Sequence, residues 1–309
     1  MMSRWMIFEG TRLMKSLRTP DARFDNLPDY DFAPNYVDIA GLRMHYVDEG
    51  PSDGAIVLLL HGEPSWSYLY RHMIPQLCNA GFRTIAPDLI GFGKSDKPSR
   101  KSDYSYSGHV AWMTAFIEAL ELTDVTLFCH DWGSLIGLRV AAQNEHRFKR
   151  IALGNGGMPT GDQKMPPAFK TWQTFARFSP VFPVGKLIQK ATVTDLADNV
   201  VRAYDAPFPS AKYKAGARAF PMLVPTTPND PASDANRAAW EIFKTWEKPF
   251  LTTFSNRDPI TRGGETIWQK TVPGAANCAH VKIRNAGHFL QEDKGPELAD
   301  ALIQFIEAA

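Results

Sequence analysis

The sequence is poor in cysteine, and its three cysteines lie far apart. Cys78, Cys129 and Cys278 include no Cys-x-x-Cys pair, which argues against a disulfide framework and against a zinc-binding motif. We interpret them as small core residues of a protein in a reducing compartment. The HExxH motif and the EF-hand loop are missing too, so we expect no metal site. The dinucleotide-binding fingerprint is also missing, which argues against a dinucleotide cofactor.

Long apolar runs and an excess of one charge are also missing. The longest clean apolar run, 55–60, is far shorter than the roughly 20 residues that cross a bilayer. Near the start, Glu9 and Arg12 interrupt the apolar stretch before it reaches signal-peptide length. Lys and Arg total 34 against 33 Asp and Glu, a net charge of +1, which provides no field to attract nucleic acid. We therefore expect a cytoplasmic protein that binds neither nucleic acid nor membranes, with a loosely held leader over 1–14.

The apolar pattern predicts an α/β fold around a mostly parallel sheet. Alternating segments at 36–39 and 42–47, joined at Ala40 and Gly41, indicate an antiparallel hairpin. Continuous apolar segments then indicate strands buried on both faces, at 56–60, 84–86, 125–129, 151–153, 250–254 and 280–283. Helical periods are formed by Val110, Met113, Ile117 and Leu120, and by Leu298, Leu302, Phe305 and Ile306. This alternation predicts a doubly wound α/β domain with right-handed crossovers.

Residues 158–230 depart from this alternation. Prolines and phenylalanines punctuate short helical pieces there, and the sheet pattern resumes at 250–254. We therefore predict a helical cap, 158–230, inserted into one α/β core formed by 1–157 and 231–309. Such an insert covers the carboxyl ends of the strands, where open α/β sheets bind their ligands. The many phenylalanines in the cap favour a small apolar ligand.

The clearest chemical motif follows the strand at 125–129. The sequence CHDWG (129–133) leads directly into an apolar helix pattern, an arrangement typical of the nucleophile elbow, a strained strand-to-helix turn that exposes its central side chain. The central residue is Asp131. A carboxylate that attacks a saturated carbon forms an ester that water can open, whereas a serine would form an inert ether. The motif therefore predicts displacement at an sp3 carbon by Asp131.

His288 and Asp258 are the candidates for a base that activates water and for its acidic partner. His288 follows the strand that ends near Ile283, and Asp258 follows the strand at 250–254. The acid would orient the imidazole and stabilise it as it takes a proton, and the chain order of nucleophile, acid and histidine is that of α/β-hydrolases. His130, next to Asp131, should point away from it, and we predict no catalytic role for it.

Four hydrogen-bond donors complete the predicted site. The backbone N–H groups of Glu63, in the loop HGEP (61–64), and of Trp132 would form an oxyanion hole. The indole N–H groups of Trp132 and of Trp172, in the cap, can donate but cannot accept. Two such groups facing one point would stabilise a departing halide ion.

Taken together, the chain from about Arg18 onward resembles the haloalkane dehalogenase family of α/β-hydrolases. The motifs that carry the resemblance are RTPDARF, HGEPSWSYLYR, PDLIGFGKSDKP, HDWG, AYDAPFP and NAGHFLQE. The resemblance implies cleavage of a carbon–halogen bond to an alcohol and a halide without a cofactor. It assigns Asp131 as nucleophile, His288 as base, Asp258 as its partner, and Trp132 and Trp172 as halide-binding residues. The partners would be a small apolar halogenated substrate, halide and water, and the chain would be a monomer or a weak homo-oligomer.

Details within these motifs look like the subfamily with two halide-binding tryptophans. Relatives outside it place Asn in the loop that here carries Glu63, and place the acid one strand earlier, where Asn155 stands in this chain.

Two alternatives share parts of this pattern. An epoxide hydrolase also uses an elbow aspartate but needs tyrosine hydroxyls in the cap, and Tyr204 and Tyr213 are candidates. A ligand-binding relative without catalysis would have a broken triad, whereas the triad here is complete. Asp131 in place of serine argues against an esterase.

Overall fold

The computed structural model describes residues 14–308. The leader predicted over 1–14 therefore lies, apart from Met14, outside the described residues. Met14 itself is partly buried against the hydrophobic core.

The main sheet is mostly parallel, which confirms the predicted fold class. Its strands are β2 (Asn35–Ile39), β3 (Leu42–Glu49), β4 (Ile56–Leu60), β5 (Arg83–Pro87), β7 (Val125–Asp131), β8 (Phe148–Gly156), β9 (Phe250–Ser255) and β10 (Val281–Ile283). Within the described residues the spatial order is β10-β9-β8-β7-β4-β5-β3-β2. The pairs β2–β3 and β3–β5 are antiparallel, and the others are parallel. A short separate pair joins β1 (Ser16–Leu17) to β6 (Lys97–Pro98).

The antiparallel opening is the hairpin that the sequence predicts. Ala40 and Gly41 have φ values of 54° and 80°, and two successive positive φ values are what a type I′ turn requires. This turn twists in the same sense as the strands, so β2 and β3 pair directly across it.

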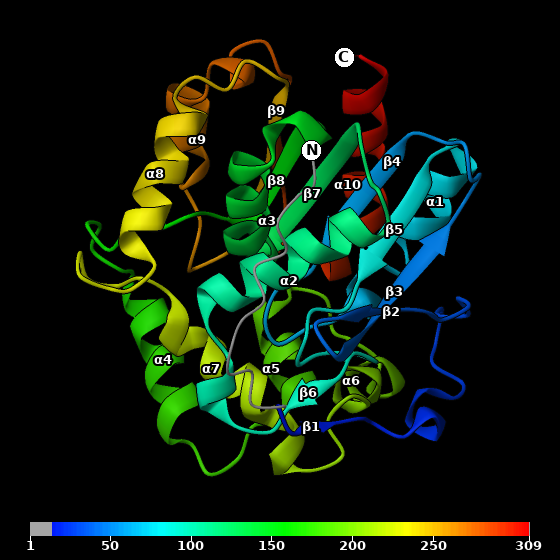
Figure 1. Cartoon of the computed structure of the whole chain (residues 1–309). Coiled ribbons are helices and arrows are strands. Elements are labelled where there is room, and N and C mark those ends of the chain that lie inside the picture. Colours follow the sequence, from blue (N-terminus) through cyan, green and yellow to red (C-terminus); the bar gives the residue numbers. More distant parts are fainter. Residues whose placement is uncertain (1–13, 309) are drawn as a thin grey trace, which may run out of the picture.

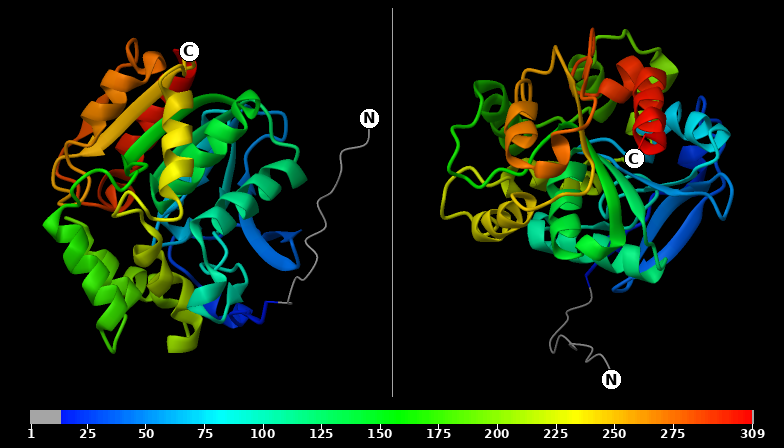
Figure 2. Two further views of the ribbon diagram at one scale, coloured as in Figure 1. Left: turned by 60° about the vertical axis from the view of Figure 1, so that its left-hand side comes forward. Right: turned by 90° about the horizontal axis from the view of Figure 1, so that it is seen from above.

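Helices cover both faces of the sheet (Figure 1). They are α1 (Met73–Asn79), α2 (Tyr106–Ala119), α3 (Trp132–Gln143), α8 (Ser233–Phe243), α9 (Glu265–Thr271) and α10 (Leu290–Glu307). α1 and α10 pack together on one face, and α2, α3 and α8 pack on the other (Figure 2). The apolar periods read from the sequence lie on buried faces: Val110, Met113 and Ile117 in α2, and Leu298, Leu302, Phe305 and Ile306 in α10. Leu120, just after α2, is only half-buried.

Between β8 and α8 the chain leaves the sheet. It forms the helices α4 (Pro167–Phe178), α5 (Val184–Ala191), α6 (Asp198–Asp205) and α7 (Ala215–Leu223), which lie together beyond one end of the sheet (Figure 1). α4 packs on α7, and α5 packs on α6. These helices fall within the predicted cap, 158–230, whose boundaries as a domain stay a prediction.

The parallel strands bring the candidate residues to one edge of the sheet. Glu63 follows β4, Asp131 ends β7, Asp258 follows β9 and His288 follows β10. Because these strands run in the same direction, their carboxyl ends lie at the same edge. Residues far apart in the sequence therefore meet there.

Candidate active site

The turn at Asp131 has the geometry that the elbow motif indicates. Asp131 ends β7 and directly precedes α3, with φ 48° and ψ −124°, a conformation that costs a non-glycine residue free energy. A Cβ on Gly133 would overlap the carbonyl oxygen of Leu60, so only glycine lets α3 pass this closely over the end of β4. The hydroxyl of Ser134 donates to the Asp131 carbonyl at 2.5 Å, which fastens the turn.

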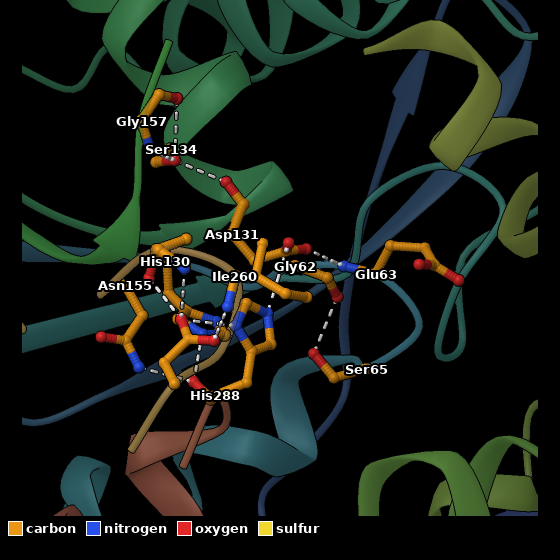
Figure 3. Close-up of polar contacts among 12 residues, drawn as sticks. Gly62, Glu63, Ser65, His130, Asp131, Ser134, Asn155, Gly157, Ile260 and His288 are labelled. Carbon is orange, nitrogen blue, oxygen red and sulfur yellow. Dashed lines mark hydrogen bonds and ion pairs between the residues drawn. The ribbon is translucent and has the colours of Figure 1, made fainter. Parts of the chain in front are cut away.

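Hydrogen-bond donors surround the Asp131 carboxylate. The backbone N–H of Glu63 donates to Oδ1 at 2.7 Å, and Nε2 of His288 lies 3.4 Å from Oδ2 (Figure 3). Burial favours the neutral acid, but His288 and the Trp132 backbone N–H outweigh it, so the pKa of Asp131 lies below its ordinary value. Asp131 is therefore ionised at neutral pH, and an ionised carboxylate is the form that can act as a nucleophile.

His288 lies between two carboxylates. Its Nδ1 is 3.0 Å from Oδ2 of Asp258, whose side chain is fully buried. Asp258 also accepts the backbone N–H of Ile260 at 2.8 Å, and the imidazole together with such donors outweighs burial and holds the pKa of Asp258 well below its ordinary value. Burial lowers the pKa of His288, but Asp258 and Asp131 outweigh burial and raise it to about 10. The resting site thus holds an imidazolium ion.

Asn155 holds the loop that carries His288, a function that the sequence analysis missed. Its amide nitrogen donates to the carbonyl oxygens of Gly287 and His288, each at 2.9 Å, and its amide oxygen accepts the backbone N–H of Ser255 at 2.8 Å. One buried side chain on β8 therefore ties the end of β9 to this loop. A polar residue at the end of a buried apolar strand was the available sequence signal.

His130 supports the same loop from the other side. Its Nε2 lies 2.9 Å from the backbone oxygen of His288, and burial, with a smaller effect from His288, lowers the pKa of His130 to about 4. The neutral ring therefore donates to that carbonyl. His130 therefore positions the loop that carries His288 through its backbone.

We expect the variant Asn155→Ala to show that this loop needs its support. The carbonyls of Gly287 and His288 would lose a buried donor, which should cost about 1–3 kcal/mol of stability. The misplaced imidazole should lower kcat by about 10- to 100-fold. Thermal unfolding and steady-state kinetics on a bromoalkane measure the two effects. A loss of stability with unchanged kcat would mean that Asn155 supports the fold alone.

A cavity of about 470 Å³ lies at the carboxyl edge of the sheet. Glu63, Asp131 and His288 line it, together with both predicted halide-binding tryptophans. Trp132 is only 3% exposed, and its ring packs against that of Phe220 with centroids 4.5 Å apart. Trp172 reaches the cavity from α4 and is half-buried. The structure thus brings both predicted indoles, one from the α/β core and one from the helices beyond it, to the wall that also carries Asp131.

The remainder of the wall is largely apolar and contains no tyrosine among the described residues. Its larger apolar members include Leu135, Met158, Met165, Phe169, Leu187, Val224, Trp240, Ile260, Ile267, Trp268 and Phe289. Tyr204 and Tyr213, which an epoxide hydrolase would need as acids, do not line this cavity. The hydroxyl of Tyr204 instead donates to Glu292, and its side chain is fully buried.

No helix within residues 14–308 has the length and apolar character needed to cross a membrane. Nor does this range hold a group of three or more His, Cys, Asp or Glu residues that could bind a metal ion. Cys78, Cys129 and Cys278 are all free thiols.

Known proteins resemble this chain over nearly its whole length. Residues 55–295 match the family model described as the alpha/beta hydrolase fold. A haloalkane dehalogenase of Psychrobacter cryohalolentis is 56% identical over 298 residues, covering 95% of this chain and 98% of that protein. Another, of Mycolicibacterium paratuberculosis, is 55% identical over 300 residues, covering 96% and 99%. The tetrameric structure of haloalkane dehalogenase DpaA from Paraglaciecola agarilytica matches with a TM-score of 0.87 at 37% identity, covering 93% of this chain and 97% of that one.

Proposed function

Because the chain belongs to the haloalkane dehalogenase family, within the α/β-hydrolase superfamily, we propose that it hydrolyses small haloalkanes to an alcohol, a halide ion and a proton. The observation that supports this best is the position of the Asp131 carboxylate, at the elbow and beside a largely apolar cavity whose wall includes Trp132 and Trp172. A carboxylate suits attack on a saturated carbon. The site lacks the serine that an esterase would carry at this position.

In the first step, an oxygen of Asp131 bonds to the carbon that carries the halogen. The carbon–halogen bond breaks, and the halide leaves with the bonding electrons, so that an alkyl ester remains on Asp131. The indole N–H groups of Trp132 and Trp172 donate to the departing halide. In a largely apolar cavity such hydrogen bonds stabilise the developing charge more than they would in water.

In the second step, His288 becomes the base. Esterification removes the charge of Asp131, one of the two carboxylates that raise the pKa of His288, so the pKa falls and the imidazolium releases its proton. The neutral imidazole then takes a proton from water as the water oxygen bonds to Cγ of Asp131. The backbone N–H groups of Glu63 and Trp132 stabilise the resulting oxyanion. Its collapse expels the alcohol, which carries the other hydrogen of the water, and restores the carboxylate beside an imidazolium.

The cap, 158–230, would determine which substrates enter. α4 contributes Phe169 and Trp172 to the cavity wall, and α5 contributes Leu187. An apolar wall favours small substrates without charge. We propose on this basis that the cap sets the chain length accepted and that the core supplies the chemistry.

Product analysis distinguishes this function from epoxide hydrolysis. We expect the purified protein to release bromide from 1,2-dibromoethane and 1-bromobutane at neutral pH without added metal, and to form no diol from styrene oxide. The physical reason is the lack of tyrosine hydroxyls in the cavity wall among the described residues, since cap tyrosines are the acids with which an epoxide hydrolase protonates the leaving epoxide oxygen. Diol without bromide would reject the proposal in favour of an epoxide hydrolase.

The variant Trp172→Phe should weaken halide binding selectively. Loss of one donor to an anion should raise the bromide dissociation constant by about tenfold or more, as measured by calorimetry. Trp240→Phe provides the matched control, because Trp240 lines the same cavity but its N–H donates to the Met158 carbonyl at 2.8 Å. Equal effects of the two substitutions would argue that Trp172 only fills space.

Assembly and location stay predictions. A monomer or weak homo-oligomer is our expectation, whereas the related DpaA is described as tetrameric. Light scattering after size-exclusion chromatography measures the mass directly. The cytoplasmic location rests on the sequence alone.

A further inference from the structure

The side chain of Glu63 is a buried carboxyl group that the proposed mechanism does not use. Only its backbone N–H has a role there, toward Asp131. Figure 3 shows this nitrogen directed at Asp131 while the side chain extends away from His288. The side chain lines the cavity, is 4% exposed, and has one oxygen, Oε1, without a hydrogen-bond partner in the described part of the chain. A buried polar atom without a partner costs free energy and calls for an explanation.

The carboxyl of Glu63 is in contact with one of the proposed halide ligands. The Trp172 side chain lies within reach of it as a hydrogen-bond donor and lowers the pKa of Glu63, against the larger effects of burial and Asp131. A halide held by that indole would therefore lie beside Glu63. An ionised Glu63 would repel the halide and would also compete with it for the indole hydrogen, since a carboxylate is the stronger acceptor.

Two acids line this cavity, Glu63 and Asp131, and their surroundings differ. Asp131 faces His288 and accepts two backbone N–H groups. Glu63 has the Trp172 indole as its only donor among the described residues, and the charged groups that face it are Asp131 and, more weakly, His288. A proton added to the pair therefore resides on Glu63. Consistently, burial and the charge of Asp131 raise the pKa of Glu63 well above its ordinary value.

We propose that Glu63 acts as a neutral carboxyl group within the halide site, where it orients the Trp172 indole at rest and donates its own O–H to the halide when one is bound. This inference rests on the proposed function. When halide enters, it replaces Glu63 as the acceptor of the indole hydrogen, and the unpartnered Oε1 carries the hydrogen that turns toward the anion. A protonated carboxyl has one donor and retains an acceptor, so a single side chain serves both states.

Infrared difference spectroscopy tests the protonation directly. Bromide added to the unsubstituted protein at neutral pH should shift the C=O stretching band of a protonated carboxyl group, and the band should be missing from Glu63→Gln. This measurement needs no turnover, and it requires only the wild-type protein and a near-isosteric variant. Absence of any bromide-sensitive protonated carboxyl band in the wild-type protein overturns the inference.

Bromide affinity, measured by calorimetry, tests the hydrogen bonding. Glu63→Leu removes donor and acceptor and should weaken bromide binding by about tenfold or more, whereas Glu63→Gln keeps both and should restore affinity to within about threefold of the wild type. Unchanged affinity in Glu63→Leu overturns the inference. So does bromide binding about tenfold tighter in Glu63→Gln, which is expected if the substitution removes an anion. Both outcomes leave the proposed function intact. Failure of the wild-type protein to bind bromide at all rejects the halide site and the proposed function with it.

Discussion

Replacing His288 by phenylalanine should convert the protein into one that reacts once and stops. Asp131 would still attack the substrate, because its carboxylate keeps the N–H groups of Glu63 and Trp132. Without the base, water could not open the ester, so steady-state kcat should fall by about 10³-fold. We expect a burst of one bromide per active site from 1-bromobutane. Intact-mass and peptide mass spectrometry should then find a butyl group on Asp131.

A suitable control for this variant is His146→Phe, since His146 is exposed and lies in the short 3₁₀ helix that directly precedes β8. It should turn over normally and carry no adduct. If His288→Phe folds yet forms no adduct with a reactive bromide, a covalent intermediate on Asp131 is wrong.

The variant Asp131→Asn should abolish both the burst and the turnover. A neutral amide cannot displace a halide from a saturated carbon, so we expect activity to fall by about 10⁴-fold or more. Bromide release with excess 1-bromobutane measures the loss. Asp124→Asn is the matched control, because Asp124 is exposed just before β7 and has a positive φ of 51°, which asparagine also tolerates. Comparable activity in Asp131→Asn and Asp124→Asn would exclude Asp131 as the nucleophile.

The variant Asp131→Asn also tests how the charge of Asp131 controls the pKa of His288. Asp131 is one of two carboxylates that raise the pKa of His288. Removing its charge should therefore lower the pKa of His288 by about one unit or more. A change of one unit corresponds to about 1.4 kcal/mol of interaction between the imidazolium and the lost charge. Imidazole NMR titration of Asp131→Asn against the wild type reads this value. An unchanged pKa would mean that esterification does not prepare His288 for the second step.

Much of the fold could be predicted because its patterns are local. The apolar segment 56–60 coincides with β4. The predicted turn at Ala40 and Gly41 is present, with the positive φ values that a two-residue hairpin turn requires. Boundaries were less predictable: β8 runs from Phe148 to Gly156, well beyond the apolar core 151–153. Pairing in the sheet extends strands past their apolar residues, and a sequence pattern does not report pairing.

The residues of the candidate site likewise divide into those that a local motif predicts and those that depend on distant contacts. Residues in motifs, such as Asp131 and His288, could be proposed because each follows a strand. Asn155 and His130 were not recognised as supports of the His288 loop, because they act through hydrogen bonds to backbone atoms 132 to 158 positions away. Nothing in the neighbouring sequence specifies such partners.

By itself the sequence determined which chemistry is available. A carboxylate at a strand-to-helix turn and indoles as donors are properties of residue type and local order. Only the tertiary structure decided the protonation states, with an ionised Asp131, an imidazolium at His288 and a carboxyl group at Glu63 whose only donor among the described residues is an indole. The physical reason is that desolvation and charge act through space, so they depend on which groups the folded chain brings within a few ångströms of one another.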